Sequence, residues 1–151
     1  MNKYTTIVAD YKHIGQRKNR SVLQNRKERI QTMDTNATVV TVTDQDFAEQ
    51  VLHAPLPVIV DFTASWCPPC RALAPVFEKL SQNYEGQLRF ARMDTDENLQ
   101  TPMQVGVQGM PTLVLFANGQ PVGRLIGPHP ARLQAGIDRL LAQIGIALGS
   151  N

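Results

Sequence analysis

Residue types that commonly build metal sites or covalent scaffolds are scarce in this chain. Its 151 residues include only two cysteines and three histidines. Two cysteines are too few for a disulfide-rich scaffold. As metal ligands they would supply half of a tetrahedral zinc site, and the histidines are too scattered in the sequence to supply the rest: His13, His53 and His129. We therefore expect no metal site.

Long apolar runs are also missing. No stretch approaches the roughly 20 apolar residues that a membrane-spanning helix needs, and residues 1–33 contain no apolar run of the length that a secretory signal requires. The composition, 42% hydrophobic and 19% charged, is ordinary for a globular protein, and the length suits one domain with its own core. We expect a cytoplasmic protein with no membrane association.

The net charge of +2 hides two unlike segments. Residues 1–38 carry eight basic and three acidic side chains, or +5, whereas residues 39–151 carry seven basic and ten acidic ones, or −3. Residues 1–37 show no amphipathic period. We predict a basic N-terminal extension, disordered or loosely helical, before a domain at residues 38–145 and a short tail at residues 146–151.

Other interpretations of the extension stay open. It is a candidate tether for a nucleic acid or a membrane surface, although we do not expect nucleic acid to be a partner of this protein. An organelle-targeting peptide is less consistent with Asp10, Glu28 and the shortage of serine. Met33 is an alternative start of the chain. We expect the extension to take no part in catalysis.

From Val39 onward, strand patterns and helix patterns alternate. The β-branched run Val58–Phe62 is typical of a central strand covered on both faces, and Asn118-Gly119 predicts a hairpin between the last two strands. The first half needs parallel crossovers, so we predict an α/β fold with a mixed sheet of about five strands and helices on both faces. The predicted strands are 39–41, 58–62, 88–93, 112–116 and 121–126; the predicted helices are 43–54, 68–84, 99–105 and 130–144.

Both cysteines lie in the segment Trp66-Cys67-Pro68-Pro69-Cys70, between the central strand and the long helix. Cys67 would be the N-cap of that helix, where backbone N–H groups and the helix dipole favour the thiolate. Cys67 is then the nucleophile of disulfide exchange, and Cys70, one turn further on and more buried, resolves the mixed disulfide. The alternative is an inert structural pair, which a proline-rich helix start makes less plausible.

Several ordered motifs give the chain from Val39 to Ile144 a resemblance to the thioredoxin family. They are Val60-Asp61-Phe62, the WCxPC-type segment, Ala74-Pro75, Asp94-x-Asp96, Gly109-Met110-Pro111-Thr112, Asn118-Gly119 and Gly127. The resemblance implies the thioredoxin fold and a cytosolic protein disulfide reductase with a Cys67–Cys70 disulfide. It also implies a monomer without a cofactor, whose partners are a thioredoxin reductase and disulfide-bearing proteins.

The resemblance also implies roles for residues outside the CxxC segment. Asp61 matches the buried acid that shuttles the proton of Cys70, where burial raises the pKa of a carboxyl; otherwise it is a satisfied polar residue at a strand end. Pro111 matches the cis-proline, beside which Met110 offers backbone groups to an extended substrate; otherwise it is a rigid turn. Arg92 stands where the family usually has lysine.

Two departures from the family pattern bear on the redox potential, in a direction that the sequence leaves open, and on substrate preference. Pro68 replaces the usual glycine; it is sterically suited to the first helical position but removes an amide and stiffens the ring. Thr63 stands where many members have a second tryptophan. We expect Trp66, Met110 and Gly127 to form the docking patch beside the cysteines, and Pro69 to be a supporting residue of the site. A disulfide oxidase or isomerase, or a partner-dedicated protein tethered by its N-terminal arm, is the alternative function.

Overall fold

The computed structural model describes residues 38–146, and these form a five-stranded mixed sheet. The strand order is β1-β3-β2-β4-β5, from β1 (Val39–Thr41), β3 (Arg89–Asp94), β2 (Val58–Thr63) and β4 (Thr112–Ala117) to β5 (Gln120–Ile126). Strands β1, β3 and β2 are parallel, whereas β4 is antiparallel to both β2 and β5. The predicted α/β fold with a mixed sheet is therefore confirmed. The predicted N-terminal extension lies outside the described residues.

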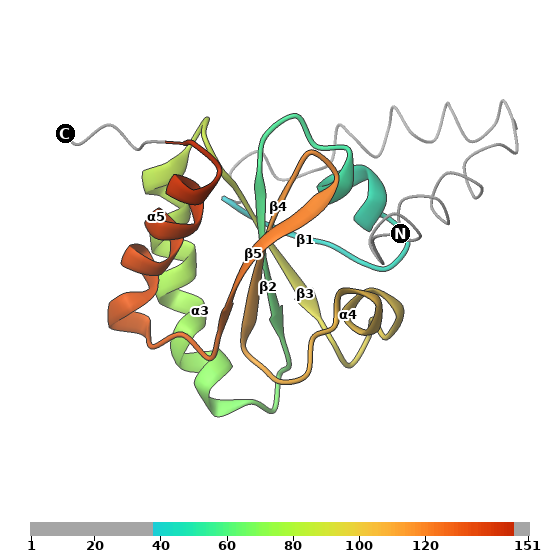
Figure 1. Cartoon of the computed structure of the whole chain (residues 1–151). Coiled ribbons are helices and arrows are strands. Elements are labelled where there is room, and N and C mark those ends of the chain that lie inside the picture. The colour runs from blue at the N-terminus through green and yellow to red at the C-terminus, as the bar shows by residue number, and fades with distance from the viewer. Residues whose placement is uncertain (1–37, 147–151) are drawn as a thin grey trace, which may run out of the picture. The chain divides into compact units, whose positions relative to one another are not determined.

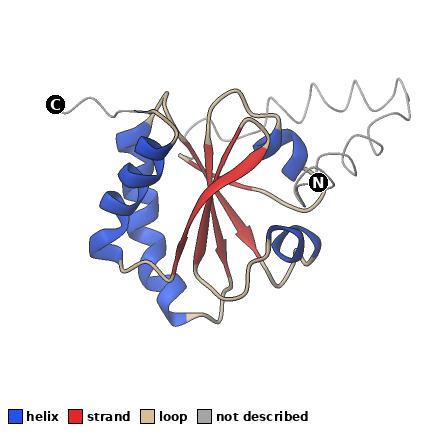
Figure 2. Cartoon of the chain, viewed as in Figure 1, coloured by secondary structure: helices blue, strands red, loops and turns tan. Residues whose placement is uncertain are grey.

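Helices cover both faces of this sheet, as predicted (Figures 1 and 2). Helix α3 continues into a short 3-10 helix and packs beside α5 on one face, while α4 and the short helix η1 lie on the other (Figure 1). Within residues 38–146, no helix has both the length and the apolar character that crossing a membrane requires. The bounds are η1 (Ala48–Leu52), α3 (Pro68–Ser81), η2 (Gln82–Tyr84), α4 (Gln100–Val105), η3 (Pro130–Arg132) and α5 (Leu133–Gln143).

Strand β2 is central because it is apolar on both faces. Its first five residues are all buried; β3 pairs with all six residues of the strand, and β4 pairs with the first five. Alternate residues face opposite layers. Ile59 belongs to the core beneath α3 and α5, so Asp61, two residues further on, points to the same layer. One charged side chain thus enters the apolar layer directly behind the start of α3.

The core beneath α3 follows from the helical spacing of its apolar residues. Leu73, Phe77 and Leu80 are buried against the sheet, and the rings of Phe77 and Phe90 lie 4.8 Å apart. Burying one such side chain stabilises the fold by about 1.5–3 kcal/mol. Packing of this kind fixes the position of α3, and therefore of its first turn, against the end of β2.

The helix predicted after Thr43 is less regular than its sequence indicates. Asp46 accepts a hydrogen bond from the Thr43 backbone N–H at 2.6 Å, which is one half of the predicted capping box. The element that follows is the five-residue π-helix η1, which ends before Pro55. The long predicted helix likewise closes with the 3-10 turn η2, and the last one opens with η3. Short tight turns at helix ends are common and leave no clear signal in the periodicity.

The β4–β5 turn provides a test of the fold. Asn118 and Gly119 have φ of 53° and 78°, as a hairpin turn with two left-handed residues requires. In addition, a Cβ on Gly119 would lie 3.3 Å from the backbone oxygen of Leu52. We expect Gly119→Ala to lower the free energy of unfolding by about 1–2 kcal/mol in urea titrations. The matched control Asn118→Gly should change it by only a few tenths; equal effects of the two substitutions would contradict this explanation.

Candidate functional site

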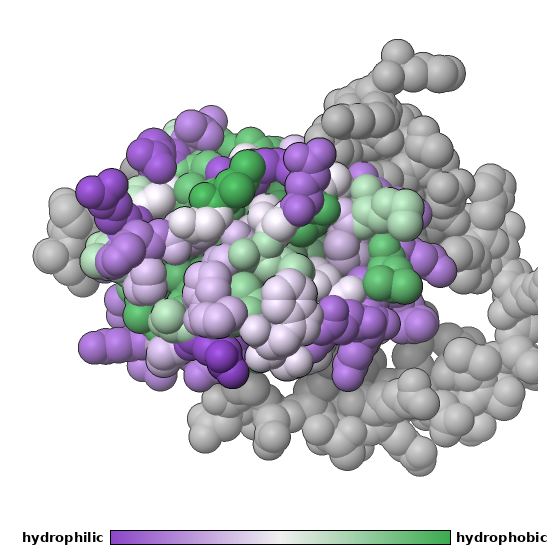
Figure 3. All heavy atoms as spheres, turned by 90° about the horizontal axis from the view of Figure 1, so that it is seen from below, coloured by the Kyte–Doolittle hydropathy of each residue, from purple (hydrophilic) through white to green (hydrophobic). Residues whose placement is uncertain are grey.

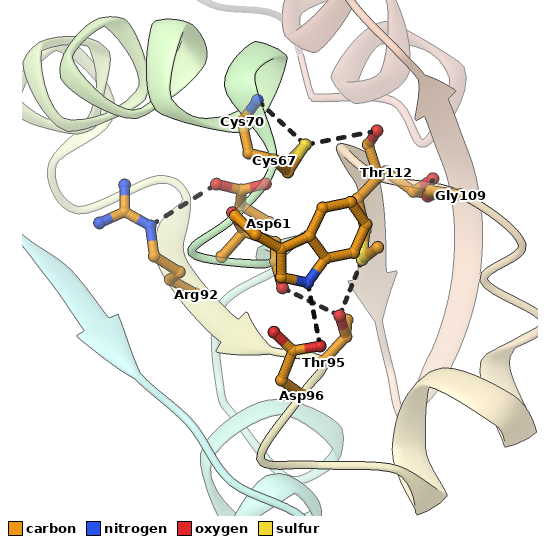
Figure 4. The surroundings of a disulfide bond; sticks show 11 residues. Asp61, Cys67, Cys70, Arg92, Thr95, Asp96, Gly109 and Thr112 are labelled. Carbon is orange, nitrogen blue, oxygen red and sulfur yellow. Dashed lines mark hydrogen bonds and ion pairs between the residues drawn. A yellow bond between two sulfur atoms is a disulfide. The ribbon is translucent and has the colours of Figure 1, made fainter.

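The two cysteines lie at the start of α3, just after the segment that connects it to β2, and they form a disulfide (Figure 4). Cys67 is the N-cap of α3 and has an extended backbone with φ −85° and ψ 110°. Its Sγ accepts a hydrogen bond from the Cys70 backbone N–H, with a nitrogen–sulfur distance of 3.3 Å. The first turn of α3 thus directs a backbone donor at the sulfur of Cys67, which is the arrangement that favours a thiolate when the disulfide opens.

Both sulfurs are shielded from solvent in the disulfide form. Cys67 is 3% exposed and Cys70 is 2% exposed, so the expected difference in burial between them is negligible in this state. They pack with Ala64, and the half-buried Met110 covers them from the other side. Both cysteines therefore present little surface to a partner while the disulfide is closed.

Pro68 and Pro69 occupy the first two positions of α3 and are exposed. Neither has a backbone N–H. The hydrogen bond that reaches the Cys67 sulfur comes from Cys70, at the third position. The amide that Pro68 removes is therefore not the one that contacts the Cys67 sulfur in the disulfide form.

The Met110–Pro111 peptide bond is cis and lies beside the disulfide. The Met110 carbonyl oxygen is 3.8 Å from the Cys67 Sγ; this is a contact and not a hydrogen bond, because a disulfide sulfur carries no hydrogen. The Thr95 hydroxyl lies 2.7 Å from the Met110 Sδ and donates to the Thr63 carbonyl at 3.1 Å. Thr95 thus ties the Met110 side chain to the end of β2. Sequence reasoning missed it, because no motif marks a lone threonine in a turn.

Asp61 is 1% exposed and lies beside the cysteines (Figure 4). Neither of its carboxylate oxygens has a hydrogen-bond partner among the described residues. The Arg92 Nε is 3.6 Å from its Oδ2, an ion-pair contact that is too long for a hydrogen bond (Figure 4). Burial raises the pKa of Asp61 from 3.8 to about 6, and the positive charge of Arg92 offsets only part of this effect. Asp61 thus combines burial with a proton affinity close to the neutral range.

Trp66 is 63% exposed and lies at the rim of the site. Its indole N–H donates a 3.2 Å hydrogen bond to Asp96, whose own backbone N–H bonds the Asp94 carboxylate. The turn after β3 therefore sets the orientation of the ring. The sequence motif Asp94-x-Asp96 pointed to this segment without showing that it contacts the tryptophan.

The described residues show no other site of comparable chemistry. Within residues 38–146, no three His, Cys, Asp or Glu side chains are grouped so that they would hold a metal ion. A hollow of about 280 Å³ lies at the opposite end of the sheet, where it is lined by residues including Leu56, Pro57, Ala117 and Ile146. It is remote from the disulfide, so it takes no part in the chemistry of the cysteines.

A CxxC disulfide at the start of a helix, next to a cis-proline and above a buried acid on a five-stranded mixed sheet, defines a thiol–disulfide oxidoreductase. The family model described as Thioredoxin matches residues 38–139. The chain belongs to the thioredoxin family.

Individual relatives agree with this assignment. The chain is 47% identical over 89 residues to a thioredoxin of Synechocystis, a match that covers 59% of this chain and 83% of that protein. It is 39% identical over 105 residues to thioredoxin C-2 of Corynebacterium nephridii, covering 69% and 97%. Among solved structures, the thioredoxin of Malassezia sympodialis aligns with a TM-score of 0.63 at 38% identity, covering 68% of this chain and 90% of that one.

The raised pKa of Asp61 predicts a pH-dependent stability. The folded state holds the proton more tightly than the unfolded state, so stability is greatest below about pH 4 and is lost as the pH rises from about 4 to about 6. Replacing Asp61 with Asn removes this loss. We expect Asp61→Asn to be more stable than the wild type above pH 6, by up to about 3 kcal/mol.

Denaturant unfolding of the oxidised proteins between pH 4 and pH 8 measures this difference. The gap between variant and wild type should shrink as the pH falls towards 4. A gap that is the same at every pH would mean that Asp61 does not titrate in this range.

Proposed function

We propose that Cys67 is the nucleophile of a dithiol reductant of protein disulfides and that Cys70 is its resolving residue. The observation that carries this proposal is the hydrogen bond from the Cys70 N–H to the Cys67 Sγ at the start of α3. It gives Cys67, and not Cys70, a backbone donor and the positive end of the helix dipole. Thiolate is the attacking species in disulfide exchange, so the asymmetry assigns the first step to Cys67.

The reaction then runs in two exchanges. The Cys67 thiolate attacks one sulfur of the target disulfide, forms a mixed disulfide and releases the other target sulfur as a thiolate. Cys70 loses its proton and attacks the Cys67 sulfur, so that the Cys67–Cys70 bond forms as the bond to the target breaks. The target leaves with two reduced sulfurs, both of which end as thiols after taking up protons, and the protein carries away the disulfide.

Asp61 is proposed as the acceptor of the Cys70 proton, directly or through one water. Its support is position and proton affinity: it is buried beside the cysteines (Figure 4), and burial raises its pKa to about 6, which makes it a stronger base than an exposed aspartate. A base of this kind accepts a thiol proton more readily at neutral pH, since general-base catalysis improves as the pKa approaches the working pH.

The target is proposed to dock along cis-Pro111 and Met110, with Trp66 and Gly127 at the edges of the contact. The backbone carbonyl of Met110 lies toward Cys67, and an extended target segment pairs well with backbone groups. Figure 3 looks onto this end of the molecule and shows green apolar patches among pale and purple residues. Two exposed large apolar residues flank this contact: Ile126, which precedes Gly127, is 75% exposed, and Trp66, which precedes Cys67, is 63% exposed. Such a surface suits a protein partner better than a small molecule.

The proposed partners are disulfide-bearing proteins and a thioredoxin reductase that regenerates the dithiol. A cytoplasmic location is part of the proposal, and one exchangeable cysteine pair is compatible with it, because disulfides in reducing compartments are usually transient and catalytic. The reductant role is favoured over oxidase or isomerase activity by relatives that are named thioredoxins, among them those of Synechocystis, Pseudomonas aeruginosa and Corynebacterium nephridii.

The order of the two steps is tested with single cysteine variants. With a thioredoxin reductase and insulin as substrate, we expect Cys67→Ser to reduce turnover by at least about 1,000-fold, because the nucleophile is gone. Cys70→Ser should still perform the first attack and accumulate a mixed disulfide, visible by mass spectrometry under non-reducing conditions. Accumulation in Cys67→Ser instead would reverse the assignment, and wild-type turnover in either variant would exclude the mechanism.

The docking role of Trp66 is tested by comparing substrates of two sizes. Trp66→Ala removes an exposed aromatic side chain at the proposed contact, so we expect about a tenfold loss in kcat/KM for insulin. Reduction of a small aromatic disulfide should change by no more than about twofold, since it makes little contact outside the cysteines. Val122→Ala, a half-exposed apolar residue at the other end of the sheet, is the matched control. Equal losses for both substrates would argue against a docking role.

A further inference from the structure

Arg92 lies between the carboxylates of Asp61 and Glu78 and makes a closer contact with Glu78. From β3 its Nη1 bonds the Glu78 Oε1 on α3 at 3.0 Å, whereas its Nε stays 3.6 Å from the Asp61 Oδ2. The first distance is a hydrogen bond and the second is not. In Figure 4 the Nε faces Asp61 and the two terminal nitrogens point away from it. The exposed carboxylate thus takes the stronger contact, and the buried one is left without a hydrogen bond.

The position of the guanidinium explains this preference. Its central carbon lies 5.9 Å from the centre of the Phe77 ring, next to Glu78 on the same helix. Arg92 Nη2 is buried and has no hydrogen-bond partner among the described residues. An unconstrained guanidinium facing a buried carboxylate would bond it through two nitrogens. The pair that arginine and aspartate ordinarily form is therefore incomplete on both sides.

We propose that Glu78 is a positioning residue for disulfide exchange: it anchors the Arg92 guanidinium against α3, so that Arg92 does not form a direct hydrogen-bonded pair with Asp61 and Asp61 stays able to accept the Cys70 proton. Glu78 itself touches no reacting atom and acts through Arg92. The inference rests on the role proposed above for Asp61. It identifies a residue that no sequence motif pointed to, on the exposed side of the helix that carries the cysteines.

Few other groups act on Asp61. Arg92 on β3 faces Asp61, the Cys67–Cys70 pair at the start of α3 lies beside it in Figure 4, and Glu78 on α3 is linked to it through Arg92. On β4 the residues opposite Asp61 and its neighbour are Leu113 and Thr112, neither of which is charged. Arg92 is the one charged side chain among these that stabilises the ionised form of Asp61. A change in the position of the Arg92 guanidinium should therefore change the pKa of Asp61.

A double-substitution cycle tests this proposal by the titration of the Asp61 carboxyl, followed through its ¹³Cγ resonance in the oxidised protein. In Glu78→Gln, Arg92 is free to pair with Asp61, so the midpoint should fall by about half a pH unit; a half-exposed ion pair couples too weakly for much more. In an Arg92→Gln background the same substitution should leave the midpoint unchanged. Glu85→Gln, which removes one negative charge about 10 Å further along the chain, is the control.

Arg92→Lys provides a second background, since a single ammonium offers no separate nitrogens to the two carboxylates and the effect of Glu78→Gln should shrink. A fall of the same size with and without Arg92 would mean that Glu78 acts by its own charge, and no fall at all would mean that it does not act; either result overturns the proposal.

The pH profile of insulin reduction distinguishes this inference from the proposed function. If Asp61 accepts the Cys70 proton, the acid limb of the profile should move with the Asp61 midpoint in Glu78→Gln. A midpoint that moves only when Arg92 is present, with an unmoved profile, would support the anchoring of Arg92 by Glu78 and count against Asp61 as the proton acceptor.

Discussion

Enclosure of β2 on both faces and along both edges is the constraint on which the site depends. Because β3 and β4 pair with β2 and helices cover both of its faces, the end of β2 has little freedom. Helix α3 begins a few residues later and is fixed by the burial of Leu73 and Phe77. Cys67 therefore sits at a helix N-terminus whose position is set by the core, and the sulfur receives the Cys70 N–H without any adjustment of the chain.

The same enclosure explains the unusual state of Asp61. A carboxylate on a central strand is shielded from solvent, and its partner Arg92 is turned toward Glu78. The incomplete pair destabilises the fold at neutral pH, because an ionised group without hydrogen bonds is buried. Functional sites commonly carry such a cost in stability. If Asp61 were fully hydrogen-bonded to Arg92, the fold would be more stable and Asp61 would be a weaker base. In the proposal above, Glu78 on the surface influences the proton affinity of Asp61 by holding the Arg92 guanidinium.

Local patterns were sufficient for most of the fold and for the centre of the site. Three patterns each predict one kind of element, and the structure agrees with all of them: a strand from the β-branched run of β2, a helix from the apolar spacing of α3, and a turn from Asn118-Gly119. The irregular helix η1 was not predictable, because hydrophobic spacing does not distinguish a π-turn from an α-turn. Thr95, Glu78 and the contact of Asp96 with Trp66 were missed for a different reason. Their contacts join elements 14 to 32 residues apart, and neither composition nor spacing encodes which polar side chains meet.

The central claim is that the first turn of α3 makes Cys67 the reactive thiol. The most direct measurement is the rate at which each cysteine of the reduced protein is alkylated by iodoacetamide between pH 5 and pH 8, with the sites identified by peptide mass mapping. The account predicts that Cys67 is modified first throughout this range and that Cys70 reacts slowly until the pH is high. Equal rates for the two thiols, or faster reaction of Cys70, would contradict it.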